Sequence, residues 1–195
     1  MSHHIYHTRG VILGSVATGE SNRFYKIFTE ELGLIGGAAQ SVREGKSKLR
    51  YTLQDLSFVT VDLVRGKEIW RIVSAGACRS QEILKKDLIR VKLFARFCAL
   101  LLRLIQGEGR DEELFEEAIR VADFLEAHEV PEVLAISFET LVQLRMLVHL
   151  GYMDKEGYGK FLGTDAYSTS GLVEFEKIRI GVIPRINEAF NASHL

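Results

Sequence analysis

The amino-acid sequence predicts an α+β protein of two domains, in which a five-stranded β-barrel precedes an all-α helical domain. Segments rich in β-branched and aromatic residues, separated by glycine-containing turns, fill the first part of the chain. From about residue 79 the apolar residues recur at helical spacing instead. A chain of 195 residues is long enough to bury two small cores. We therefore expect one domain over residues 1–77 and a second over 78–195.

The first domain is predicted to contain five strands joined by short turns. Glycine occurs in each of the turns Gly19-Glu20-Ser21, Glu31-Leu32-Gly33 and Arg65-Gly66-Lys67. The residues between them favour strands, and either Ile69 or Trp70 is expected to reach a core. The predicted strands cover residues 6–17, 24–29, 34–42, 53–64 and 68–74.

Five strands in about seventy residues indicate a small closed barrel, because closure removes the sheet edges that favour aggregation. The strand number is that of an oligonucleotide-binding (OB) fold. The exposed strands and loops of this fold characteristically hold single-stranded nucleic acid.

The second domain is predicted to be a bundle of helices. A basic helix begins near Arg79 and ends at Gly107-Glu108-Gly109, and Asp111 caps an acidic helix that extends to about Ala127. Opposite charge on successive helices favours two neighbours with complementary faces. Further helices are expected from Pro131 to Gly151 and over residues 172–192, the latter interrupted or kinked at Pro184. Residues 154–170 resemble a loop.

The composition is that of an ordinary globular protein, with 47% hydrophobic residues and a formal net charge of −1. Cys78 and Cys98 are too few for a four-cysteine zinc site, and we expect both to be small core residues. The longest apolar stretch, residues 88–105, carries four Lys or Arg residues, which argues against a membrane span. No signal peptide is apparent, so we expect a cytoplasmic protein.

A dense basic loop is the main candidate for function. Its cations Arg43, Lys46, Lys48 and Arg50 are opposed by Glu44 alone. Such a run on a Gly- and Ser-containing loop suits the regularly spaced phosphates of a nucleic-acid strand. A solvated surface loop is the alternative. We expect phosphate contacts from these four residues and then from Arg23, with weaker candidates in Arg65 and Lys67.

Gly45-Lys46-Ser47 also resembles the end of a phosphate-binding loop of nucleotide hydrolases. That motif requires a glycine where this chain has Gln40, and it should open a helix. Tyr51 and Thr52 favour a strand instead. The sequence therefore argues against a nucleotide-binding site.

The remaining chemistry-bearing residues suggest no catalytic site, cofactor or metal. The aromatic residues Tyr25, Tyr51 and Trp70 are candidates for base stacking, but core positions explain each of them more simply. His3, His4 and His7 leave metal binding open, although a strand edge accounts for them too.

The front of the chain resembles the bacterial DNA repair protein RecO family. The resemblance begins with Arg9-Gly10-Val11-Ile12-Leu13 and Gly19-Glu20-Ser21-Asn22-Arg23. It continues through residues 28–33, a small-residue strand, the basic loop, Leu53-Gln54 and the Ile69-Trp70 step, and more loosely through Phe138-Glu139 to Leu150-Gly151-Tyr152.

This resemblance implies an N-terminal OB-fold and a helical C-terminal domain. It also implies a non-enzymatic recombination mediator of the bacterial nucleoid that binds single- and double-stranded DNA and anneals complementary strands. With RecR, such a protein helps load RecA onto DNA covered by single-strand-binding protein. Many relatives carry a four-cysteine zinc finger after the Leu150-Gly151-Tyr152 segment, but residues 153–195 contain no cysteine, so no zinc finger is expected.

Two other functions remain open at this point. The barrel can instead serve as a protein-interaction scaffold with little DNA binding of its own, which the near-neutral net charge favours. An enzyme such as a nucleotide hydrolase would depend on Gly45-Lys46-Ser47 alone.

Overall fold

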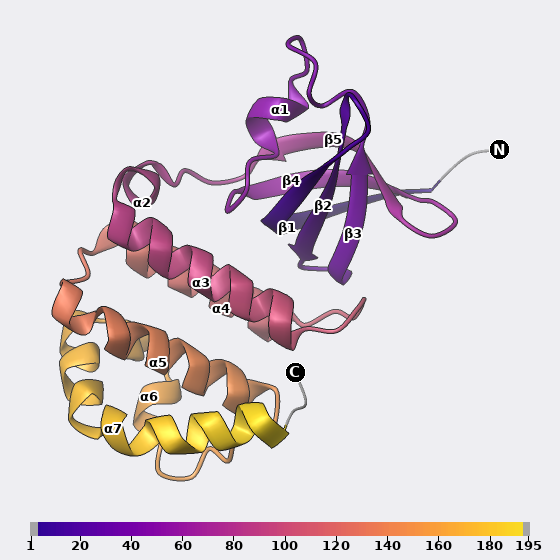
Figure 1. The fold of residues 1–195 in the computed structure, drawn as a ribbon. Coiled ribbons are helices and arrows are strands. Elements are labelled where there is room, and N and C mark those ends of the chain that lie inside the picture. Colours follow the sequence, from indigo (N-terminus) through magenta and orange to yellow (C-terminus); the bar gives the residue numbers. More distant parts are fainter. Residues whose placement is uncertain (1–3, 193–195) are drawn as a thin grey trace. The chain divides into compact units, whose positions relative to one another are not determined.

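A computed structural model describes residues 4–192. These residues form two compact units (Figure 1). The first, called the barrel unit here, comprises the chain up to Gln81 together with Ile105–Phe115. The second, called the helical unit, comprises Glu82–Leu104 and the chain from Glu116 onward. No helix in the described part of the chain is both long and apolar enough to cross a membrane.

Five strands close into a barrel in the order β1-β2-β3-β5-β4, which confirms the predicted barrel. Their bounds are β1 (Ile5–Thr18), β2 (Asn22–Thr29), β3 (Gly33–Ala39), β4 (Phe58–Arg65) and β5 (Trp70–Ala77). The long strand β1 pairs antiparallel with β2 through its second half and with β4 through its first half. The pairing of β1 with β2 has a register shift between Ile12 and Gly14, and an irregularity of this kind bends a strand and increases its twist.

A parallel contact between β3 and β5 completes the barrel. It consists of two residue pairs, Gly37 with Trp70 and Ala38 with Arg71. By comparison, β2 and β3 are paired at seven positions from Arg23 to Thr29.

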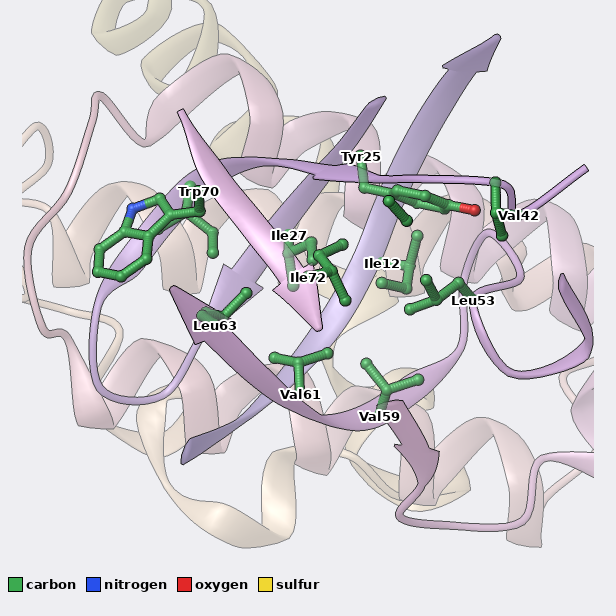
Figure 2. Close-up of a cluster of buried hydrophobic side chains, with 12 residues drawn as sticks. Ile12, Tyr25, Ile27, Val42, Leu53, Val59, Val61, Leu63, Trp70 and Ile72 are labelled. Atoms are coloured by element: carbon green, nitrogen blue, oxygen red, sulfur yellow. The ribbon is translucent and has the colours of Figure 1, made fainter. Parts of the chain in front are cut away.

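Side chains from all five strands fill the barrel (Figure 2). Trp70 is 3% exposed and lies in this core, whereas Ile69 is exposed, which decides between the two candidates for that position. The buried cluster consists of Ile12, Tyr25, Ile27, Ile35, Ala39, Val42, Leu53, Val59, Val61, Leu63, Trp70 and Ile72.

The segment before β4 differs from the prediction. Residues Leu49–Thr52 form a single helical turn, α1, and β4 begins at Phe58 rather than at Leu53. Leu49 packs on the barrel core and Leu53 is buried in it. Because residues four apart lie on one side of a helical turn, both leucines reach the core while Tyr51 stays exposed. The prediction of a strand over residues 53–57 and of a core position for Tyr51 was therefore wrong.

The segment 105–115 belongs to the barrel unit although it follows a helix of the other unit. Gly109 donates its backbone N–H to the Leu32 carbonyl at 3.1 Å. Glu108 accepts a hydrogen bond from the Trp70 indole at 3.0 Å. These contacts attach the segment to the β2–β3 turn and to the first residue of β5.

The helical unit contains the predicted helices with adjusted bounds, and the all-α character of this part is confirmed. The expected first helix is divided into α2 (Glu82–Lys86) and α3 (Leu88–Leu104). The acidic helix α4 (Glu112–Ala127) begins after Asp111, whose carboxylate accepts the Leu114 N–H at 2.9 Å as a helix cap. Helix α5 spans Glu132–His149, and α7 (Thr169–Ala192) runs through Pro184 as one helix. Short helices α6 (Gly159–Leu162) and η1 (Thr164–Ala166) occupy the expected loop.

Helix α5 forms ion pairs with both α3 and α4. Glu117 of α4 pairs with Arg145 of α5, and Arg96 of α3 pairs with Glu139 of α5. Between α3 and α4, the Arg90 guanidinium donates to the carbonyls of Leu125 and Glu126. Each of these two helices is therefore tied to α5 by an ion pair, and the complementarity of the basic and acidic helices stays a prediction.

Candidate nucleic-acid interface

The basic loop, defined here as residues 40–48, connects β3 to α1 in the barrel unit. Its cations Arg43, Lys46 and Lys48 are exposed, and so is Arg50 in α1. Within the part of the chain that the structure describes, Lys46 and Lys48 form no ion pair. Their charge is therefore not neutralised by a neighbouring carboxylate and is available to an anion from solution.

Hydrogen bonds from the β1–β2 turn hold the start of this loop in place. The Arg43 backbone N–H donates to the Ser21 carbonyl at 2.9 Å, and the Arg43 guanidinium donates to the Gly19 carbonyl at 3.1 Å. The Ser41 N–H donates to the Asn22 side-chain oxygen at 2.9 Å. These bonds fix Arg43 before any ligand arrives.

Three of the predicted cations come together around one polar hollow in the barrel unit. Arg23 comes from the start of β2, Arg43 from the basic loop and Arg50 from α1. They are neighbours because Arg23 pairs with Ala39, the last residue of β3, so that the chain enters the basic loop beside it. The hollow has a volume of about 280 Å³ and is completed by Tyr25, Val42 and Leu53.

Arg23 carries a donor that the described residues leave unused. Its Nε is buried and has no hydrogen-bond partner among them. Tyr25 is buried beneath the same hollow, and Figure 2 shows its hydroxyl directed toward Val42. Burial raises the pKa of Tyr25 above 10.0, against the opposing effect of Arg23, so its hydroxyl keeps its proton.

Arg65 is the last residue of β4 and Lys67 lies in the β4–β5 connection, and neither lines this hollow. Arg65 forms an ion pair with Glu108, and its guanidinium lies 4.6 Å from the centre of the Trp70 ring. The Arg65 hydrogen bond lowers the pKa of Glu108, so this carboxylate is ionised and offsets the cation. Lys67 is exposed and has no ion-pair partner among residues 4–192. A role for either residue in DNA binding stays a prediction.

Of the three aromatic candidates for base stacking, two are buried. Tyr25 is 1% exposed and Trp70 is 3% exposed, so neither ring can stack on a base while the barrel is closed. Tyr51 is 70% exposed and follows Arg50 in α1, so its ring lies on the surface beside one of the hollow's arginines. Tyr51 is therefore the aromatic residue best placed to contact a base.

The sequence did not identify the residues that anchor the basic loop. Gly19 and Ser21 belong to a predicted turn and Asn22 follows it, and their contacts with Ser41 and Arg43 join segments about twenty residues apart. Asn22 was the available signal, because asparagine side chains often hydrogen-bond to backbone groups near turns.

The histidines and cysteines of the described residues do not gather into a metal-binding cluster. His7 bonds to Asp62 at 2.6 Å across β1 and β4, whereas His3 lies outside the described residues. Within residues 4–192, no group of three or more His, Cys, Asp or Glu side chains could hold a metal ion. Cys98 is buried as expected, but Cys78 is exposed at the end of the barrel, so its predicted core position was wrong.

The helical unit has an apolar hollow of about 250 Å³ between α3 and α5. Leu93, Phe97 and Val142 contribute to its wall. Arg96 and Arg103 border it, and Arg96 is engaged with Glu139. The Arg103 guanidinium lies 4.6 Å from the centre of the Phe190 ring, so both arginines have local partners, in contrast to Lys46 and Lys48 of the basic loop.

Comparison with known proteins relates the barrel unit to one family. Residues 1–81 match the family described as "Recombination protein O N terminal". The chain is 30% identical over 149 residues to DNA repair protein RecO of Clostridium novyi, a match that covers 76% of this chain and 57% of the relative. It is 29% identical over 149 residues to the RecO protein of Dehalococcoides mccartyi, with the same coverage. The match to the RecO protein of Rubrobacter xylanophilus is 29% over 125 residues, or 64% of this chain and half of the relative. The chain therefore spans little more than half the length of these relatives.

Proposed function

Because this chain belongs to the RecO family of DNA repair proteins, we propose that it is a recombination mediator that acts directly on DNA. In this proposal the barrel unit binds single- and double-stranded DNA, and the protein anneals complementary strands. Together with RecR it assists the loading of RecA onto DNA covered by single-strand-binding protein. Such a function implies a location at the nucleoid in the bacterial cytoplasm.

The observation that carries this proposal is the unneutralised cationic surface around the basic loop. Lys46 and Lys48 extend from an exposed loop, and Arg43 is held beside them by bonds to the β1–β2 turn. Binding of these cations to phosphates releases the counterions condensed on DNA, which favours association at low salt on any sequence. The formal net charge of −1 means that this attraction is local and not a property of the whole surface.

Annealing requires electrostatic and steric work but no covalent chemistry. Two backbones that repel each other must be brought close while their bases stay accessible for pairing. Cations on one exposed loop reduce the repulsion between phosphates, and Tyr51 offers a surface ring that can stack on any base. No catalytic group is needed for this role.

A protein-interaction scaffold is the second candidate function. The net charge of −1 and the neutralisation of Arg65 by Glu108 both reduce the general attraction to DNA. A scaffold would show no salt-sensitive DNA binding of its own, with or without RecR, and this property separates the two candidates.

The deciding experiment uses the double variant Lys46→Ala/Lys48→Ala. We expect the unmodified protein to accelerate annealing of complementary strands coated by single-strand-binding protein, and the variant to be slower. We also expect the slope of log affinity against log salt to fall by roughly 1.4, because each phosphate contact to a single strand contributes about 0.7.

The matched control is Lys155→Ala/Lys177→Ala, which removes two exposed lysines from the helical unit. It should leave both the annealing rate and the salt slope close to those of the unmodified protein. A protein that binds DNA without any salt dependence, or that does not accelerate annealing, would favour the scaffold.

A further inference from the structure

We propose that the hollow bordered by Arg23, Arg43 and Arg50 binds the terminal phosphate of a DNA strand. This inference depends on the proposed DNA-binding function and makes it more specific. It assigns to one site a ligand, the phosphate monoester at a strand end, that differs in charge and shape from the phosphodiesters along the strand.

The first argument is charge. Three guanidinium groups border the hollow, no carboxylate lines it, and none of the three forms an ion pair with another described residue. Three like charges gathered in one place raise the free energy of the empty site. A phosphate monoester carries about −1.5 to −2 at pH 7, whereas a phosphodiester carries a single charge. The monoester therefore compensates this cluster better.

The second argument is the number of hydrogen-bond donors. A guanidinium is a planar fork that matches phosphate oxygens. The monoester presents three such oxygens, one for each of the three arginines, while a diester presents two. Arg23 Nε is buried without a partner, and a buried donor of this kind is costly unless an acceptor reaches it. A phosphate seated in the hollow would supply that acceptor.

The third argument is the shape of the hollow. Its inner wall consists of Tyr25, Val42 and Leu53, which are all buried members of the barrel core (Figure 2). A DNA strand cannot pass through this wall, so a strand that enters the hollow from solvent must have its end there. A phosphate at a strand end satisfies this condition, because the chain leaves it on one side. An internal phosphate must let the strand leave on both sides.

The charge of the ligand also gives the site a pH signature. The second ionisation of a phosphate monoester has a pKa of about 6. The dianion therefore predominates at pH 7.5, whereas the monoanion predominates at pH 5. The titratable or charged groups that line the hollow are its three arginines and Tyr25, and Asp55 acts on Tyr25; Glu44, Lys46 and Lys48 belong to the basic loop. No histidine lines it, so a change between these two pH values reports the ligand.

The experiment measures the affinity of the full chain for short thymidine oligonucleotides with an internal fluorescent label. One carries a 5′-phosphate, one a 3′-phosphate and one hydroxyls at both ends. We expect one phosphorylated end to bind at least about tenfold tighter than the hydroxyl end at pH 7.5, the effect of one charge-assisted hydrogen bond. The comparison of the two phosphorylated strands identifies the end, and at pH 5 the preference should shrink.

Two variants test the assignment of residues. Arg23→Gln and Arg50→Gln should each abolish most of the preference for the phosphorylated end. Arg50 is exposed on α1, so its variant remains informative even if replacement of the partly buried Arg23 disturbs the fold. The control Arg71→Gln removes an exposed cation of β5 that does not line the hollow, and it should keep the preference.

Equal affinity for all three strands would overturn the terminal-phosphate site while leaving DNA binding intact. A preference that survives both Arg23→Gln and Arg50→Gln, or that is as strong at pH 5 as at pH 7.5, would overturn it as well. Failure to bind any of the strands would instead reject the proposed function itself.

Discussion

Glu117 is an ionised carboxylate in the interior of the helical unit. Its side chain and that of Arg145 are each 7% exposed. Arg145 donates to both carboxylate oxygens, at 2.5 Å and 2.8 Å, and the Tyr167 hydroxyl donates to one of them at 2.6 Å. Burial opposes ionisation of Glu117, but the hydrogen bonds and charge of Arg145 outweigh it, so the pKa of Glu117 is lowered.

Arg145 also fixes the segment that follows α5. Its Nη1 donates to the carbonyls of Phe161 and Gly163 at 2.9 Å and 2.8 Å. One guanidinium thus joins α4, α5 and the α6–η1 connection, and all of these contacts are lost together if it is removed.

We expect Arg145→Met to destabilise the helical unit by up to about 3–5 kcal/mol, because it removes the buried partner of Glu117 and leaves this carboxylate with the partly exposed Arg120, at 3.0 Å, and the Tyr167 hydroxyl. Urea unfolding followed by far-UV circular dichroism measures this loss, since most of the helix lies in this unit. The control Arg96→Met breaks the more exposed pair with Glu139 and should cost less than about 1 kcal/mol. Similar losses for the two variants would show that burial does not strengthen the Glu117–Arg145 pair.

The β2–β3 turn depends on a glycine that other side chains cannot replace. Gly33 has a φ of +69°, and a Cβ there would lie 2.2 Å from the Gly109 carbonyl oxygen. The turn therefore requires a backbone conformation and a close approach that both exclude a side chain. The residue that begins β3 is also the residue against which segment 105–115 packs.

We expect Gly33→Ala to destabilise the barrel unit by at least the roughly 1–3 kcal/mol of a strained backbone residue, with a further loss from displacement of Gly109. Urea unfolding followed by fluorescence measures it, because Trp70 is the sole tryptophan of the sequence and lies in the barrel. Gly45→Ala is the control, since a Cβ at Gly45 meets nothing within 4 Å. Equal urea midpoints for both variants would contradict the close contact.

The helical turn α1 shows why the sequence was misread locally. Tyr51 and Thr52 favour strands, and that preference suggested an early start of β4. Leu49 and Leu53 share one face at a spacing of four, but a single turn is too short for this period to stand out in sequence. Burial of these two leucines at the end of the barrel outweighed the local preference.

Carboxylates in both units have a lowered pKa, so the whole chain should be sensitive to acid. A hydrogen bond from Arg9 lowers the pKa of Glu30, and one from Arg65 lowers that of Glu108. In the helical unit the pKa of Glu117 is lowered, because the hydrogen bonds and charge of Arg145 outweigh the effect of burial. Each group binds fewer protons in the folded state than in the unfolded state once the pH falls below the ordinary value of 4.5.

We therefore expect the thermal midpoint to be nearly constant from pH 7 to pH 5 and to fall steadily below pH 4.5. Trp70 fluorescence reports the barrel unit and far-UV circular dichroism reports the helices, so both losses can be followed in one sample. The variant Glu117→Gln should reduce the acid dependence of the helical signal while leaving that of the fluorescence unchanged. A midpoint that holds or rises at pH 3 would contradict the stabilising role of these carboxylates.

Much of the architecture followed from the sequence because turns and hydrophobic period are local signals. Gly19, Gly33 and Gly66 marked the strand ends, and the change of period near residue 79 marked the helices. The site was predicted less completely. Arg23, Arg43 and Arg50 are brought together by strand pairing and by bonds to the β1–β2 turn, neither of which leaves a local pattern. The Glu117–Arg145 pair was missed for the same reason, since isolated charged residues ordinarily indicate surface.

The two-pair contact between β3 and β5 has a consequence for how the barrel moves. Regions held by few hydrogen bonds open at the lowest free energy. The barrel should therefore part first between Gly37-Ala38 and Trp70-Arg71, where two pairs hold the strands together. Gly37 and Ala38 lie just before the basic loop. A nucleic acid that exerts force on this loop therefore acts on the β3–β5 contact, where the barrel has the fewest paired residues.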